Sequence, residues 1–229
     1  MFHVNQSQLG EDSPPKPLLI VEDGTHPVIL FLHGTCLQNS YYAQLFEHIA
    51  SHGYMLVAPQ VFLFHFQSYM CMNLFGHSRG GKTAFALALG KAKTSLQEVN
   101  ISALLGVDPV AGLGKECSEP IILRDGTFDL SIPVTIIGTG LGDHPKYPHV
   151  PFWPACAPDS LNHKEFFSKS KPPKGHFVFT EYGLLGMLND DLTSEFVVQF
   201  FNDLCTANGS GSKAPMRSGV GGITVALLE

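Results

Sequence analysis

The sequence predicts an α/β fold, a mostly parallel sheet with helices on both faces. Continuous apolar runs such as residues 27–32 (PVILFL) and 102–107 (SALLGV) are typical of strands that are buried on both faces. Stretches with helical periodicity alternate with these runs, which favours parallel strands joined by helices. With 229 residues, 44% of them hydrophobic, the chain is long enough for one such domain with a sizeable core.

The predicted elements follow one another along a single domain, residues 17–229, after a leader at 1–16 that we expect to be disordered. Gly53 ends the first predicted helix, and turn residues bound most of the other elements. No internal repeat or second domain is visible. Strands are expected at residues 17–21, 27–32, 54–61, 102–107, 132–138 and 177–180, helices at 41–52 and 195–205, and a flexible connection at 206–219.

One connection is too short for this architecture. Only about eight residues separate the strand ending near residue 61 from the strand expected near residue 69, whereas a parallel crossover with its helix needs at least about ten to twelve. We therefore expect one βαβ crossover, between about residues 62 and 74, to be shortened or missing.

Composition excludes several classes of function. The net charge of −6 without a basic cluster argues against nucleic acid and anionic membranes as partners. The longest apolar stretch, residues 54–66, is interrupted and too short to span a bilayer, so no transmembrane segment is expected. No signal or transit peptide is legible. The five cysteines are widely spaced without a CxxC pair, which favours free thiols over zinc or a disulfide scaffold.

The most informative segment is residues 75–81 (FGHSRGG), which predicts a sharp strand-to-helix turn at Ser78. Such a turn strains the serine backbone and lifts its hydroxyl clear of the sheet. Gly76 and Gly80 are needed because strand and helix pass too closely for side chains. The amide of Arg79, at the helix N-terminus, can then stabilise an oxyanion. Ser78 is the candidate nucleophile; the alternative is a Gly-Ser turn before a buried helix.

A second oxyanion donor is expected after the first buried strand, where His33-Gly34-Thr35 follows residues 27–32. In this architecture a main-chain amide from that loop faces the nucleophile. The amide of Thr35 or of Cys36 would serve. The alternative is a histidine that simply ends a strand.

Two aspartates occupy positions suited to the acid of a catalytic triad. Asp108 follows residues 102–107, and Asp143 follows the next predicted strand. Open α/β sheets collect their chemistry at the carboxyl ends of the strands. Spacing does not choose between the two, and each has an alternative as a solvated loop acid.

The base of a triad should follow the last strand, in the loop at residues 181–191 (EYGLLGMLNDD), which contains no histidine. His176 precedes the predicted strand and so lies at its wrong end. His144, His149 and His163 lie in the preceding long loop and could act only if that loop folded over the site. The pair at 144 and 149 lacks the fixed spacing of a metal site, and no metal or cofactor is expected.

Several blocks, in this order, resemble plant chlorophyllases: GHSRGGKTAFALALG, SALLGVDPVAG, IPVTIIGTGLG and MRSGVGG. The resemblance covers most of residues 17–228 and implies an α/β-hydrolase fold. It also implies a small-molecule substrate, with hydrolysis of the phytyl ester of chlorophyll to chlorophyllide and phytol. Asp108 matches the catalytic aspartate of the family, which leaves Asp143 as a loop residue. A chloroplast location is suggested only by the substrate of the family.

The chain departs from the family at the base. The catalytic histidine of the family lies in a YGHMDML-like motif, which here places Leu184 at the histidine position. The family also carries several tens of residues that are absent before the segment at 75–81. Three alternatives to a chlorophyllase stay open: a non-catalytic relative that binds a tetrapyrrole or a partner, a truncated product, and a generic carboxylesterase.

Overall fold

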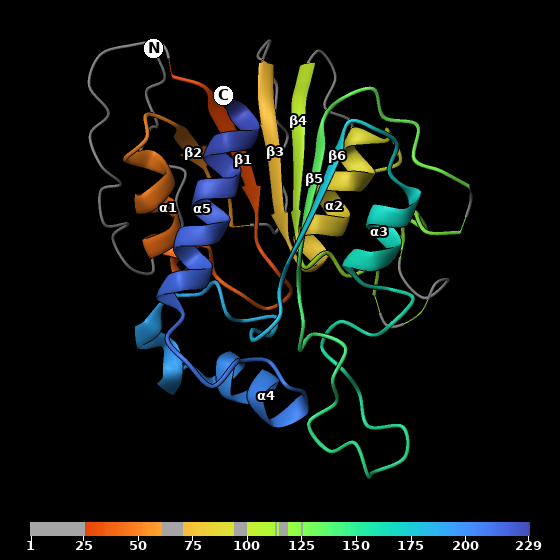
Figure 1. Ribbon diagram of the computed structural model, residues 1–229, viewed down its shortest axis with the longest axis vertical. Helices are drawn as coiled ribbons and strands as arrows, with labels where there is room; N and C mark the ends of the chain where they lie inside the picture. The colour runs from red at the N-terminus through yellow and green to blue at the C-terminus, as the bar shows by residue number, and fades with distance from the viewer. Residues whose placement is uncertain (1–25, 61–70, 94–99, 113, 115–118, 125) are drawn as a thin grey trace.

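A computed structural model describes residues 26–60, 71–93, 100–112, 114, 119–124 and 126–229. Its centre is a six-stranded, fully parallel sheet with the order β2-β1-β3-β4-β5-β6 (Figure 1). The prediction of a mostly parallel sheet is confirmed. The strands are β1 (Val28–Leu32), β2 (Met55–Val57), β3 (Cys71–His77), β4 (Asn100–Val107), β5 (Val134–Thr139) and β6 (Lys174–Phe179).

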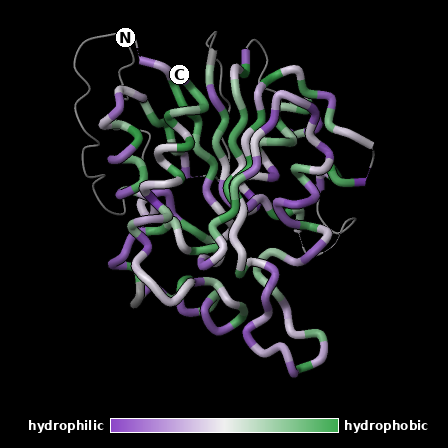
Figure 2. Tube along the Cα trace, viewed as in Figure 1, coloured by the Kyte–Doolittle hydropathy of each residue, from purple (hydrophilic) through white to green (hydrophobic). Residues whose placement is uncertain are grey.

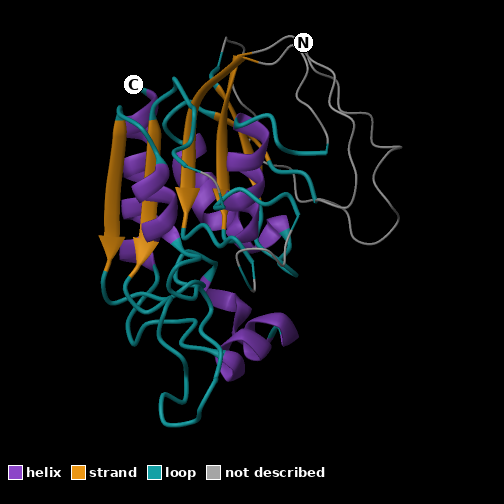
Figure 3. Cartoon of the chain, turned by 90° about the vertical axis from the view of Figure 1, so that its right-hand side faces the viewer, coloured by secondary structure: helices purple, strands orange, loops and turns teal. Residues whose placement is uncertain are grey.

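Helices cover both faces of the sheet, as predicted. One face carries α1 (Ala43–Ala50) and α5 (Ala214–Leu228); the other carries α2 (Arg79–Ala88) and α3 (His163–Lys169) (Figure 1). A further helix, α4 (Phe196–Leu204), lies beyond the carboxyl ends of the strands, where long loops also gather (Figure 3). Two short 3₁₀ helices, η2 (Asn39–Tyr42) and η3 (Asp190–Ser194), precede α1 and α4. No helix in the described part of the chain is long and apolar enough to cross a bilayer.

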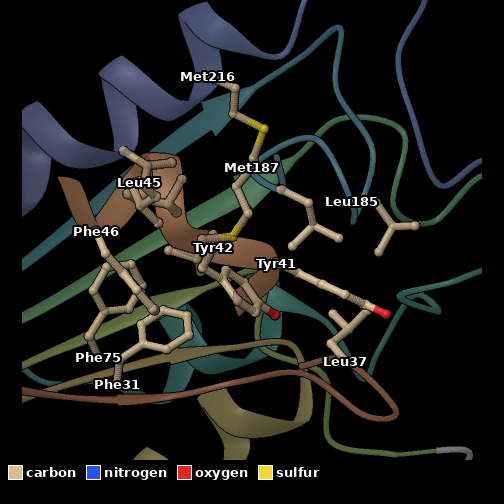
Figure 4. Packing of buried hydrophobic residues seen from close by; sticks show 14 of the residues in the cluster. Phe31, Leu37, Tyr41, Tyr42, Leu45, Phe46, Phe75, Leu185, Met187 and Met216 are labelled. Atoms are coloured by element: carbon tan, nitrogen blue, oxygen red, sulfur yellow. The ribbon is translucent and has the colours of Figure 1, made fainter. Parts of the chain in front are cut away.

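The alternation of side chains along β1 divides the core into two layers. Ile29 and Phe31 face α1 and α5, whereas Leu30 and Leu32 face α2. The strands accordingly carry mostly apolar residues along their length (Figure 2). On the α1 side, the ring of Phe31 packs edge-on against three neighbours at centroid distances of 4.7–4.8 Å (Figure 4); these are Tyr42, Phe46 and Phe75.

Strand β2 is shorter than predicted. Only Met55–Val57 pair with β1, at the sheet edge, rather than the whole of residues 54–61. The polypeptide then runs from residue 58 to β3, and residues 61–70 of this connection lie outside the described residues. The expected strand at 17–21 and the leader at 1–16 also lie outside them. The shortened crossover therefore stays a prediction.

The expected flexible connection at residues 206–219 is wrong at its C-terminal end, because α5 begins at Ala214. Glycines make this helix hard to predict, since they are poor helix formers. Here they permit close packing: a Cβ on Gly221 would collide with the His48 ring of α1, and one on Gly219 with the Phe179 ring. Tertiary contact with α1 and β6, rather than local propensity, therefore explains α5.

The expectation of free thiols is wrong for one pair of cysteines. Cys156 and Cys205 form a disulfide, with their Cα atoms 5.4 Å apart and a sequence separation of 49. Cys36 is an exposed free thiol. The sequence spacing of two such distant cysteines does not predict a bridge. The pair forms because the fold brings the loop before α3 next to the end of α4.

Candidate active site

Ser78 occupies a strained turn between β3 and α2. Its backbone angles are φ 55° and ψ −121°, a region that residues other than glycine rarely adopt. The predicted glycine roles are confirmed, since a Cβ on Gly76 would collide with the main chain of Gly80, and one on Gly80 with the carbonyl of Leu32. The sharp turn therefore depends on glycine at both flanking positions.

Main-chain hydrogen bonds tie this turn to the end of β4. The amide of Ser78 donates to the oxygen of Val107 at 3.0 Å, and the amide of Val110 donates to the oxygen of Ser78 at 3.1 Å. Asp108, between these two partners, is thereby held in the loop beside Ser78. Two of the predicted site residues thus lie in directly bonded neighbouring segments.

Asp108 is completely buried and points at the end of β5. Thr139 donates to its carboxylate twice, from Oγ1 at 2.5 Å to Oδ2 and from the amide at 3.4 Å to Oδ1. Burial raises the pKa of Asp108 to about 7, although both hydrogen bonds from Thr139 oppose the rise. The backbone at Asp108 also has a positive φ of 42°. The structure thus holds a single orientation of this acid.

Asp143, the other candidate acid, has a different environment. It is partly exposed and pairs with Lys164 of α3 at 2.7 Å and with His144 at 3.7 Å. Its charge adds to the rise in the pKa of Asp108 that burial causes. Asp143 therefore forms ion pairs at the surface of a loop, in contrast to the buried Asp108.

Leu184, at the expected histidine position, is buried in the loop after β6. Its side chain packs against Val110 and Ala157, in a small apolar cluster next to the Asp108 loop. Its main-chain oxygen lies 2.9 Å from Nε2 of His77, the residue before Ser78. The loop therefore reaches the site as predicted, but it presents a side chain that can neither accept nor donate a proton.

His77 is not available as a substitute base. Because the oxygen of Leu184 can only accept, Nε2 of His77 carries the proton, and Nδ1 accepts a hydrogen bond from the hydroxyl of Tyr42 at 2.7 Å. Tyr42 in turn accepts from the amide of Gly34 at 3.1 Å. Burial lowers the pKa of His77 to about 4, so the ring is neutral at physiological pH.

The four histidines weighed as bases in the sequence lie on β6, on α3 and in the loop between β5 and α3. His176 is inside β6, which begins three residues earlier than predicted, and bonds to Nδ1 of His163 at 2.9 Å. His163 is buried, with a pKa lowered to about 4, mainly by burial, and it bonds to the main chain of Thr139. His149 is exposed, and His144 pairs with Asp143. Over the described ranges, no three histidine, cysteine or acidic residues cluster as metal ligands would.

The loop after β1 lies against Ser78, where the sequence predicts an oxyanion donor. A Cβ on Gly34 would lie only 3.2 Å from Cβ of Ser78, so this loop passes Ser78 at van der Waals distance. Thr35 follows in an exposed turn, and Arg79 opens α2. Both line a cavity of about 660 Å³, together with Gln60. Sequence reasoning missed the network of Tyr42 and His77 behind this loop, since its members are far apart in the chain.

Comparison with known families identifies similar sequences. A family model described as Chlorophyllase matches residues 1–71 and 66–229. Chlorophyllase-1 of Arabidopsis thaliana is 43% identical, over 95% of this chain and 76% of that protein, and chlorophyllase-2 of the same plant is 37% identical, over 99% and 80%. Chlorophyllase-1, chloroplastic, of Citrus unshiu is 40% identical, over 94% and 72%.

Solved structures show the same architecture. An α/β hydrolase enzyme from the metagenome of lagoon sediments of Mar Chica, Morocco, superposes with a TM-score of 0.51 at 14% identity. The match covers 79% of this chain and 92% of that enzyme. At this identity, the likeness establishes the fold alone, an α/β-hydrolase fold.

Proposed function

Because this chain belongs to the chlorophyllase family, we propose that it is a serine ester hydrolase acting on the phytyl ester of chlorophyll. Ser78 is the nucleophile and Asp108 the acid. The observation that carries the proposal is the backbone of Ser78, with φ 55° at a strand-to-helix turn bonded to the loop of Asp108. A strained serine at this point of an α/β sheet is typical of nucleophiles of acyl transfer.

The reaction follows from the positions of the main-chain groups. Oγ of Ser78 attacks the ester carbonyl carbon and gives its proton to solvent water, and the negative charge collects on the former carbonyl oxygen. The amides of Arg79 and Thr35 donate to that oxyanion. Collapse releases phytol, which takes up a proton, and leaves the acyl group on Ser78. Water then hydrolyses this ester to give chlorophyllide and free Ser78.

Proton transfer is the weak step in this chain. In a complete triad a histidine accepts the proton of the serine and passes it to the leaving alcohol. Leu184 stands at that position and cannot do so, and His77 is neutral with both nitrogens bonded. Loss of one triad member commonly removes several powers of ten in turnover, leaving what binding and the oxyanion donors supply. We therefore expect slow hydrolysis.

A second candidate function has its own support. The side chain of Leu184 packs into an apolar cluster with Val110 and Ala157. A protein that binds a tetrapyrrole or its ester without turnover needs the cavity but not the base. This candidate is a non-catalytic relative of the chlorophyllases.

One experiment separates the two candidates. Release of chlorophyllide from chlorophyll is measured for the unsubstituted protein and for Ser78→Ala, with binding of chlorophyll followed in parallel by fluorescence quenching. Slow release that Ser78→Ala abolishes supports the hydrolase. Equal release from both proteins excludes Ser78 as nucleophile, and binding without release supports the non-catalytic relative.

A further inference from the structure

Two segments beyond the carboxyl ends of the strands are joined into one unit. They are the loop between β5 and α3, and helix α4 (Figure 1). Nε1 of Trp153 donates to the oxygen of Leu204 at 2.6 Å, and Lys146 pairs with Asp203 at 3.1 Å. The disulfide from Cys156 to Cys205 closes the unit. Ser78 and Asp108 lie at the same end of the sheet, because each follows the carboxyl end of a strand.

This unit exposes large apolar side chains that we call the apolar rim. Phe196 and Phe200 are four residues apart and so share one face of α4; Phe196 is 80% exposed and Phe200 about half. On the loop, the side chain of Phe152 is fully exposed, and two more residues are close to half-exposed. The apolar rim consists of Tyr147, Val150, Phe152, Phe196 and Phe200. Exposed apolar side chains gathered at one end of a molecule indicate an interaction surface.

The apolar rim offers almost no fixed charge to a partner. Residues 147–158 and 196–202 contain no aspartate, glutamate, lysine or arginine. Two lysines that border the rim are paired with aspartates, Lys146 with Asp203 and Lys164 with Asp143. A surface of this kind complements an electrically neutral layer. Within these two stretches no charged side chain is present to form an ion pair with an acidic or a basic partner; the exposed acids Asp159 and Glu195 lie just outside them.

We propose that the apolar rim docks the protein onto an uncharged or zwitterionic lipid surface, with Phe152, Phe196 and Phe200 inserted at the interface. Aromatic side chains are favoured at the boundary of lipid and water. Main-chain hydrogen bonds connect the unit that carries the rim to the loop of Leu184: the oxygen of His144 accepts from the amide of Thr206, and the oxygen of Ala207 accepts from the amide of Leu185.

Docking onto lipid fits the proposed substrate. The biological purpose of the docking rests on the proposed function. An ester with a long alkyl chain resides in lipid, and the rim would hold the end of the sheet that carries Ser78 toward the lipid surface. The docking itself needs no turnover. It can therefore be tested with a protein whose nucleophile has been removed.

The test is flotation with phosphatidylcholine vesicles, using the full chain and Ser78→Ala. We expect both proteins to bind, and the triple variant Phe152→Ser, Phe196→Ser, Phe200→Ser to lose at least tenfold in partition coefficient. Because these side chains are exposed, the triple variant should keep its circular dichroism spectrum and melting temperature. The matched control, Phe177→Ser with Val178→Ser, removes similarly exposed side chains from β6 and should bind within about twofold of the parent.

The lipid composition identifies the kind of surface. Addition of phosphatidylglycerol or of 0.5 M salt should change binding by less than about twofold, since screening weakens only charge-driven attachment. The proposal is overturned if the triple variant binds like the parent, if the parent binds no phosphatidylcholine, or if binding requires the anionic lipid. It is also overturned if size-exclusion chromatography shows that the triple variant converts a dimer to a monomer, because the rim would then be a protein interface.

Discussion

Nε2 of His77 donates to the main-chain oxygen of Leu184 at 2.9 Å, which links the residue before the candidate nucleophile to the loop that should carry the base. The link extends through Tyr42 to Gly34, so the turn at Ser78, the loop after β1 and the loop after β6 are tied to one another by hydrogen bonds. The three loops of the proposed site are therefore held together around Leu184, a side chain that cannot exchange protons.

Replacement of that side chain should create a competent site. We expect Leu184→His to raise kcat on chlorophyll by about 10³-fold, because a base would stand between Ser78 and Asp108. Leu184→Asn is the matched control, similar in size and polarity but unable to act as a base. Equal rates for the two variants would contradict the assignment, as would a gain that survives Asp108→Asn in the Leu184→His protein.

The strained backbone at Ser78 should be detectable as a difference in stability. Both Ser78→Gly and Ser78→Ala remove the hydroxyl, but only glycine adopts φ 55° with ψ −121° without strain. We therefore expect the glycine variant to unfold with a free energy about 1 kcal/mol higher than the alanine variant. Urea unfolding measures this difference, and an alanine variant as stable as the glycine variant would show that the turn is unstrained.

Burial of Asp108 should make stability depend on pH. Its pKa is raised from 3.8 to about 7, so between these values the folded state keeps a proton that the unfolded state releases. Stability from this group is thus present below about pH 4 and is lost as the pH rises through 7. Relative to the parent, Asp108→Asn should gain roughly a few kcal/mol of unfolding free energy between pH 4 and pH 8. The free energy of unfolding is measured by urea titration at each pH. If it changed with pH in the same way for the parent and for Asp108→Asn, the raised pKa of Asp108 would be contradicted.

His77 has the opposite pH dependence. We expect His77→Phe to lower the free energy of unfolding at pH 7 by about 2–3 kcal/mol, because Tyr42 and Leu184 lose a buried partner. Burial lowers the pKa of His77 to about 4, so stability from the neutral ring is present above about pH 6.5 and is lost as the pH falls through 4. The deficit of the variant should accordingly narrow on acidification. The exposed His149→Phe is the control and should follow the parent.

The disulfide should stabilise the loops around the site. Cys205→Ser is expected to reduce the free energy of unfolding by about 2–4 kcal/mol, as a bridge that closes a loop of this length commonly does. Dithiothreitol should lower the melting temperatures of the parent and of Cys36→Ser by the same amount, because both keep the bridge. It should leave the melting temperature of Cys205→Ser unchanged. A parent insensitive to the reductant would show that the bridge contributes no stability.

The local chemistry of the sequence was enough to predict the sharp turn at Ser78. The turn at Ser78 depends on Gly76 and Gly80, and these glycines lie within two residues of Ser78 in the sequence. The choice of Asp108 over Asp143 required the family resemblance, because both follow strands with the same pattern. The catalytic roles of these residues stay predictions until activity is measured.

Contacts between distant segments decided the rest. The pairing of Cys156 with Cys205, the bonds of His77 to Tyr42 and Leu184, and helix α5 with its poor local propensity all depend on segments that only folding brings together. A sequence records which side chains exist and their local preferences, whereas burial and hydrogen bonding arise between residues far apart in the chain. That is why the sequence was enough to find a leucine at the position expected for the base. Only the tertiary structure showed that Val110 and Ala157 pack against Leu184.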